Sequence, residues 1–134
     1  GDLANARRDT CGTGTQTAAL CIGGTGDTDA TEEYGGATWT AGGNLNTARP
    51  KAEGSAIGLQ TAALLAGGSS YQANVEAYNG TSWTATANMA TARGGLGGDG
   101  TNDTSAIAFG GAPSRNITEE FLDLGNTVTS LDVS

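Results

Sequence analysis

The residue types that most often carry chemistry are scarce in this chain of 134 residues. The absence of histidine removes Ser-His-Asp triads, imidazole metal ligands and the commonest general base. Glu32 and Glu33 are adjacent, as are Glu119 and Glu120. On strands such neighbours point to opposite faces, so they would not act together as the paired acids of a glycosidase do. We therefore predict a protein that is not an enzyme and uses no cofactor.

The two cysteines, Cys11 and Cys21, lie five residues on either side of Gln16. If the chain turns at Gln16, the two thiols face each other across a hairpin, and we expect an intrachain disulfide. A disulfide would indicate an oxidising, extracellular setting. The alternative is that both cysteines are small buried residues.

Two acidic segments contain oxygen groups of the kind that bind Ca²⁺. The segment GDTDATEE contains Asp27, Asp29 and either Glu32 or Glu33 as candidate ligands. The segment GGDGTNDT contains Asp99, Asn102 and Asp103. Neither has the full spacing of an EF-hand or of a nonapeptide calcium repeat. We interpret both segments as solvated turns and predict no metal site.

The net charge of −8 argues against two classes of partner. Nucleic acids and anionic membranes both favour clusters of Lys and Arg, and this chain has only six such residues, scattered along its length. No apolar stretch approaches the roughly 20 residues that span a bilayer. We expect neither nucleic acid nor membrane as a partner.

Several features recur along the chain in steps of 42 to 44 residues. Each unit contains an Arg that closes a phrase such as NLNTAR, a Gly-Gly pair, and a Glu two residues before an aromatic. These features are Arg7, Arg49 and Arg93; Gly23-Gly24, Gly67-Gly68 and Gly110-Gly111; and Glu32/Tyr34, Glu76/Tyr78 and Glu119/Phe121. Trp39 and Trp83 follow their tyrosines by five residues, whereas the third unit has Asn126 at that place. A long regular period argues against disorder, although Leu, Ile, Val and Phe are only 19 of the 134 residues.

Each unit predicts four short strands and no helix. The second strand of each unit is an apolar run that ends in Gly-Gly, with large side chains on one face and mostly small ones on the other. The large faces carry Leu20/Ile22, Leu64/Ala66 and Ile107/Phe109, and the small faces carry Ala19/Cys21, Ala63/Leu65 and Ala106/Ala108. Because both faces are apolar, these strands should be covered on both sides by closely stacked sheets.

An apolar run into Gly-Gly, then Glu-x-Tyr, then Trp, resembles the kelch repeat, which builds the four-stranded blades of β-propellers. The resemblance covers nearly the whole chain. It implies one all-β domain, a kelch-like β-propeller segment with three blades at roughly 1–46, 47–90 and 91–134. WD40 repeats are a weaker match, since Trp39 and Trp83 are followed by Thr and no Gly-His pair exists. The Gly/Thr/Ala-rich composition also resembles kelch-type repeats of phage tail-fibre and secreted bacterial proteins.

The recurrence of these residues favours structural roles, because a ligand site would more often be unique. We interpret NLNTAR as the corner where the outermost strand of one blade leads to the innermost strand of the next. The recurring Glu residues are expected to form a hydrogen bond or ion pair, with the corner Arg as the candidate partner. Trp39 and Trp83 are expected to pack between blades.

Three blades cannot close a ring, since propellers typically use about 4–8. We expect a homodimer that forms a six-bladed ring; a filament, or a longer parent chain that supplies the missing blades, are the alternatives. The predicted function is a non-catalytic structural or binding module, part of an extracellular or virion fibre or appendage. The alternative is a lectin-like propeller that binds glycans, for which Tyr71 is the aromatic residue outside the repeat pattern.

Overall fold

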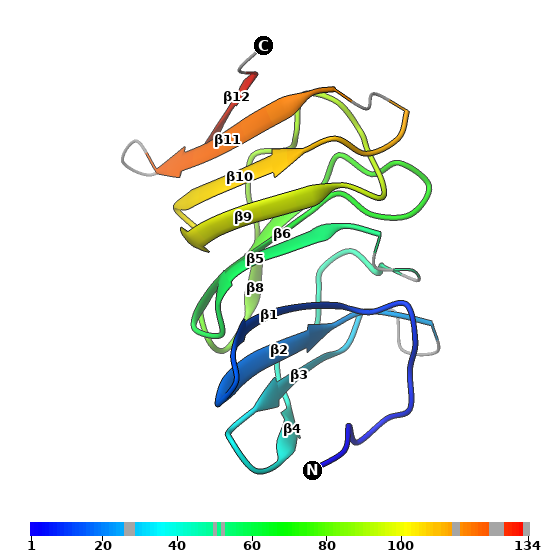
Figure 1. The fold of residues 1–134 in the computed structure, drawn as a ribbon, viewed down its shortest axis with the longest axis vertical. Helices are drawn as coiled ribbons and strands as arrows, with labels where there is room; N and C mark the ends of the chain where they lie inside the picture. Colours follow the sequence, from blue (N-terminus) through cyan, green and yellow to red (C-terminus); the bar gives the residue numbers. More distant parts are fainter. Residues whose placement is uncertain (26–28, 50, 52, 114–115, 124–127, 133–134) are drawn as a thin grey trace.

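Twelve short β-strands make up the regular structure in the computed structural model (Figure 1). It describes residues 1–25, 29–49, 51, 53–113, 116–123 and 128–132. The strands are β1 (Cys11–Thr15), β2 (Ala18–Ile22), β3 (Thr31–Tyr34), β4 (Trp39–Ala41), β5 (Ser55–Leu59), β6 (Ala62–Ala66), β7 (Val75–Tyr78), β8 (Trp83–Ala85), β9 (Gly97–Asn102), β10 (Ser105–Phe109), β11 (Thr118–Asp123) and β12 (Val128–Asp132).

The strands form three four-stranded antiparallel sheets, each running in chain order. We call them sheet 1 (β1–β4), sheet 2 (β5–β8) and sheet 3 (β9–β12). The predicted all-β class and the four-strand unit are therefore confirmed. Within the described part of the chain, no helix has the length and apolar character that crossing a membrane requires.

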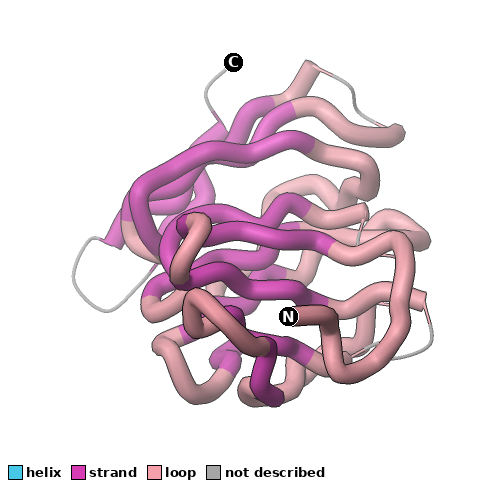
Figure 2. Tube along the Cα trace, turned by 60° about the horizontal axis from the view of Figure 1, so that its bottom comes forward, coloured by secondary structure: helices cyan, strands magenta, loops and turns pink. Residues whose placement is uncertain are grey.

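The sheets form an open stack, with sheet 1 and sheet 3 at its two ends and sheet 2 between them (Figure 1). Their first strands lie side by side, since β5 contacts both β1 and β9. The strands run roughly along one direction, and the loops collect at their ends (Figure 2). Sheet 2 is thus covered on both faces, whereas sheets 1 and 3 each turn one face outward.

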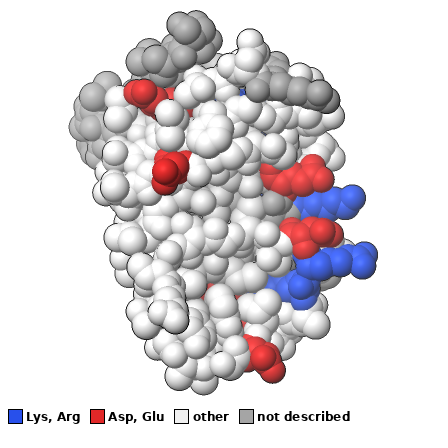
Figure 3. All heavy atoms as spheres, in the orientation of Figure 1, with Lys and Arg blue, Asp and Glu red and all other residues white. Residues whose placement is uncertain are grey.

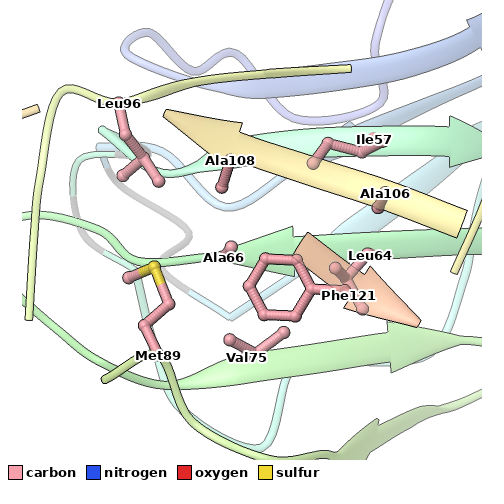
Figure 4. Packing of buried hydrophobic residues seen from close by; sticks show 9 residues of the cluster. All are labelled: Ile57, Leu64, Ala66, Val75, Met89, Leu96, Ala106, Ala108 and Phe121. Atoms are coloured by element: carbon pink, nitrogen blue, oxygen red, sulfur yellow. The ribbon is translucent and has the colours of Figure 1, made fainter. Parts of the chain in front are cut away.

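The contact between neighbouring sheets joins a large face to a small one, as the alternation of the apolar runs predicts. Leu20 and Ile22 of sheet 1 pack with Ala63 and Leu65 of sheet 2 in one core cluster. The second cluster joins the opposite face of sheet 2 to sheet 3, and Figure 4 shows Phe121 beside the side chains of sheet 2. Close packing of small on large side chains lets a chain with few large aliphatic residues form a continuous core.

Each Gly-Gly pair ends the second strand of its sheet in a conformation that favours glycine. All six residues have positive φ, for example 70° at Gly67 and 69° at Gly110. A Cβ on Gly67 would also lie 2.6 Å from the carbonyl oxygen of Arg93. The pairs recur because both the backbone conformation and the close approach of the next corner exclude a side chain.

Candidate functional site

The recurring Arg and Glu form an ion pair in every unit, which confirms the predicted partnership. In each case a terminal guanidinium nitrogen lies against one carboxylate oxygen. The pairs are Arg7–Glu32 at 2.6 Å, Arg49–Glu76 at 3.3 Å and Arg93–Glu119 at 2.9 Å. Each Arg therefore binds the third strand of the sheet that follows it in the chain.

The guanidinium also ties the second strand of the sheet to the third. Nη1 of Arg93 donates to the carbonyl oxygens of Gly110 at 2.8 Å and Ile117 at 3.0 Å. Nη1 of Arg7 repeats the arrangement with Gly23 at 3.2 Å and Ala30 at 2.9 Å. The first glycine of each Gly-Gly pair thus presents its carbonyl to the corner Arg.

The carboxylate in turn holds the corner segment by its backbone. Glu76 accepts hydrogen bonds from the amides of Asn46 at 2.7 Å and Thr47 at 3.0 Å. Glu119 accepts one from the amide of Ala90 at 2.8 Å. Charge-assisted hydrogen bonds of this kind are stronger than neutral ones. The phrase NLNTAR is repeated because each corner must present both these amides and its Arg to one buried carboxylate.

Burial and hydrogen bonding shift the pKa values of the corner Glu and Arg side chains in opposite directions. Burial raises the pKa of Glu32, but hydrogen bonds from Ala4, Arg7 and Asn5 outweigh it and hold the pKa below its usual range. Burial lowers the pKa of the Arg49 guanidinium, against the attraction of Glu76. The three Arg side chains are 0% exposed and the three Glu side chains at most 3%. The corner groups are therefore structural, since no ligand can reach them from solvent.

The predicted disulfide between Cys11 and Cys21 is absent from the structure, where both cysteines are thiols. The hairpin turns over two residues, so its centre falls between Gln16 and Thr17. The register pairs Cys11 with Ile22 and Gly12 with Cys21. A shift of one residue puts the two cysteines on opposite faces of sheet 1.

Both cysteines are buried, as the alternative interpretation predicts. The thiol of Cys11 lies between sheets 1 and 2 and donates to the carbonyl oxygen of Gly54 at 2.9 Å. Burial raises the pKa of Cys11 to about 11, against the opposing effect of the Gly54 hydrogen bond. At neutral pH this thiol is protonated and a poor nucleophile.

The interpretation of the acidic segments as turns is only partly correct, because Asp99 lies in strand β9 and the first segment ends in strand β3. Asp27 lies outside the described residues, and Asp29 accepts a hydrogen bond from Nδ2 of Asn44 at 3.3 Å. Asn102 caps its own turn by accepting from the amide of Thr104 at 3.0 Å. Among the described residues, no group of three or more acidic, Cys or His side chains is arranged to hold a metal ion.

Trp83 packs between sheets, as predicted, and forms a polar contact there. Its side chain is buried, and its indole nitrogen donates to Oγ1 of Thr31 in sheet 1 at 2.9 Å. Trp39 occupies the same place in sheet 1 but lies partly exposed on the outer face, with its ring 5.1 Å from that of Tyr34. Within one chain it does not pack between two sheets, contrary to the prediction, because sheet 1 is at the end of the stack. Asn126 lies outside the described residues, and the register instead puts Ser130 opposite Phe121.

The two outward faces of the stack are candidate sites for a partner. The outer face of sheet 3 exposes Phe109 at 45% and Leu122 at 38%. Beside them lies a hollow of about 470 Å³, lined in part by Ile107, Glu120 and Leu122. The outer face of sheet 1 carries Tyr34 and Trp39, both partly exposed. The sequence pattern marked Tyr34 as a repeat feature and Glu120 as one of two adjacent acids, but it placed neither on an outward face.

A second candidate site surrounds Tyr71, the exposed aromatic outside the repeat pattern. Tyr71 is 52% exposed, and both Ser70 and Tyr71 have positive φ. Ser70 also lines a hollow with Lys51 and Glu53.

Figure 3 shows that charged side chains gather mainly along one edge of the face in view, while most of that face is uncharged.

Comparisons with known proteins identify the fold and no family. No family model matches the chain, and no curated protein sequence matches it. Among 85 matching chains of solved structures is one described as the structure of YjhT, with a TM-score of 0.77 and 14% sequence identity. The match covers 97% of this chain and 47% of the YjhT chain, so this chain spans less than half of that length. The likeness shows a β-propeller-like arrangement of the three sheets.

Proposed function

We propose that the chain is a non-catalytic structural or binding module that self-assembles through the outward faces of its end sheets. In this proposal the three sheets are kelch-like blades, and two chains complete a six-bladed ring with twofold symmetry. The open stack is the observation that carries the proposal. Phe109 and Leu122 are exposed on one end face, and faces of this kind are normally covered in soluble repeat proteins.

The extent of the match to YjhT supports this ring. Three sheets of this chain correspond to 47% of a longer chain with a similar fold. A second set of three sheets would supply the other half, and a second copy of the chain is a direct source of it. The same contact, if its rotation did not close, would build a filament instead.

We place the module in an extracellular or virion fibre or appendage, because its Gly/Thr/Ala-rich repeats resemble those of phage tail fibres and secreted bacterial proteins. The acidic charge of −8 suits neither nucleic acid nor an anionic membrane as partner. The cysteines do not add to this assignment, since no disulfide joins Cys11 and Cys21.

Light scattering coupled to size-exclusion chromatography tests the self-assembly. At micromolar concentration we expect a single species with twice the mass of one chain, and negative-stain images of closed rings. A folded monomer at that concentration would refute both the dimeric ring and the filament. A ladder of larger species would select the filament over the ring.

The exposure of Tyr71 favours a second candidate function, glycan binding at the loops. Aromatic rings often stack on sugar faces, and Tyr71 is exposed. Ser70, the residue before Tyr71, lines a hollow together with Lys51 and Glu53. A glycan array with wild type and Tyr71→Ala tests it. Binding that is lost in the variant supports the lectin interpretation, and no binding by the wild type rejects it.

A further inference from the structure

The contact between sheets 1 and 2 contains two polar pairs that join one sheet to the other. The hydroxyl of Tyr78 in sheet 2 donates to the carboxylate of Glu33 in sheet 1. The indole of Trp83 in sheet 2 donates to Thr31 in sheet 1 at 2.9 Å. Tyr78 is fully buried, so its hydroxyl needs this partner. Sheet 2 supplies both donors and sheet 1 both acceptors.

The contact between sheets 2 and 3 replaces all four of these groups at the equivalent positions. Phe121 stands in place of Tyr78, and Ala77 in place of Glu33. Ala77 packs against the apolar cluster that contains Phe121. Val75 takes the position of Thr31, and the register puts Ser130 where Trp83 would be. The Tyr78 hydroxyl and its Glu33 acceptor are therefore both replaced by apolar side chains in this contact.

The two outward faces of the stack carry the polar set and not the apolar one. On sheet 1, Tyr34 and Trp39 occupy the positions of Tyr78 and Trp83. In the single chain the Tyr34 hydroxyl donates to the exposed carbonyl oxygen of Gly36 at 3.0 Å, a bond that docking would exchange for one to a carboxylate. On sheet 3, Glu120 and Thr118 occupy the positions of Glu33 and Thr31. The donors lie at one end of the chain and the acceptors at the other, each partly exposed. Glu120 also lines the hollow on its face.

From this complementarity we infer that sheet 1 of one chain docks on sheet 3 of a second copy, with the Tyr34 hydroxyl bound to Glu120 and the Trp39 indole bound to Thr118. The inference rests on the proposed self-assembly and specifies its contact. The two aromatic rings of the second copy fill the hollow beside Glu120. Leu3, which is half-buried here, aligns with the buried Leu45 and Met89 and becomes covered by the same contact.

A double-mutant cycle tests the Tyr34–Glu120 pair, with the dissociation constant of the dimer as the readout. Tyr34→Phe leaves the Glu120 carboxylate without this donor. Glu120→Ala leaves the Tyr34 hydroxyl with the carbonyl oxygen of Gly36, to which it donates at 3.0 Å within its own chain. Tyr34→Phe is expected to weaken the dimer by about tenfold to a hundredfold, and Glu120→Ala by less, because the Tyr34 hydroxyl keeps its Gly36 acceptor. The double variant copies the Phe121–Ala77 contact of the same chain, and we expect it to associate within a few-fold of wild type.

Mixing two variants tests the direction of the contact. Trp39→Arg blocks the face of sheet 1, and Ile107→Arg blocks that of sheet 3. Each variant alone is expected to be monomeric, with a wild-type circular dichroism spectrum. An equimolar mixture brings one intact pair of faces together and should form heterodimers.

The outcomes separate this inference from the proposed function. A monomeric wild type overturns the self-assembly itself. A dimeric wild type whose affinity is unchanged in both single variants, or a mixture without heterodimers, overturns the Tyr34–Glu120 contact and leaves self-assembly in place.

Discussion

The two contacts inside the stack use the same positions for opposite chemistry. Sheets 1 and 2 meet through Tyr78 bound to Glu33, whereas sheets 2 and 3 meet through Phe121 packed near Ala77. Apolar residues surround these positions in both contacts. In our inference, this difference lets the polar positions select which sheet docks on which neighbour. A mismatched contact would bury a carboxylate or a hydroxyl without a partner.

The largest effect is expected when the polar contact loses its main aromatic. Trp83→Ala removes a buried ring and its hydrogen bond to Thr31, and should lower the free energy of unfolding by about 3–5 kcal/mol. Urea denaturation measures the change. Trp39→Ala is the matched control, because the same ring lies partly exposed on an end face, and it should cost the monomer about 1 kcal/mol. Equal losses in the monomer would contradict the assignment of Trp83 to the inner contact.

Placing a polar group in the apolar contact should have the next largest effect. Ala77→Glu puts a carboxylate beside Phe121 with no donor, and we expect a loss of about 3 kcal/mol. Adding Phe121→Tyr rebuilds the polar pair and should recover about half of the loss. Thermal or urea unfolding of the single and double variants gives the coupling energy. A coupling energy of zero would show that the two positions do not face each other.

A smaller loss is expected when the polar pair is broken from one side. Tyr78→Phe leaves Glu33 without its donor and should cost about 2 kcal/mol. The double variant Tyr78→Phe with Glu33→Ala converts this contact to the apolar type and should return to within about 1 kcal/mol of wild type. If the double variant loses as much free energy of unfolding as Tyr78→Phe and Glu33→Ala lose together, then the two positions act independently.

The smallest effect concerns alkaline pH. Burial, followed by the hydrogen bond to Glu33, raises the pKa of Tyr78 from 10.0 to about 12. The unfolded chain therefore loses this proton first, so the stabilisation is complete below the unfolded pKa and is lost as pH rises towards the folded value. Between about pH 8 and about pH 11 the stability difference between wild type and Tyr78→Phe should shrink by about 1 kcal/mol. A constant difference over that range would contradict the raised pKa.

The repeats predict most of the fold because they report local requirements. The Gly-Gly pairs indicate backbone positions with positive φ, and the alternating apolar runs indicate strands covered on both faces. The recurring Arg and Glu indicate one buried ion pair for each sheet. Each of these requirements is met within one unit or between neighbouring units, so it leaves a periodic trace in the sequence.

The features that the sequence did not predict depend on loop length or on pairing between sheets. Cys11 and Cys21 fall on opposite faces because the hairpin turns over two residues and not three. Ser130, and not Asn126, lies opposite Phe121 because β11 and β12 are longer than β3 and β4. The relation of Tyr78 to Glu33 becomes visible only when the two sheets are placed face to face.

The corner ion pairs have a thermodynamic consequence for the whole chain. Arg49 and Arg93 head the fully buried side chains by volume, so guanidinium groups fill space that larger apolar residues fill elsewhere. Hydration of apolar groups raises the heat capacity on unfolding, whereas hydration of polar groups lowers it. With few large aliphatic residues and many buried polar atoms, this chain should unfold with a small heat-capacity change for its length. The free energy of unfolding would then change little with temperature. On cooling, the protein would lose less stability than one that depends on a large hydrophobic core.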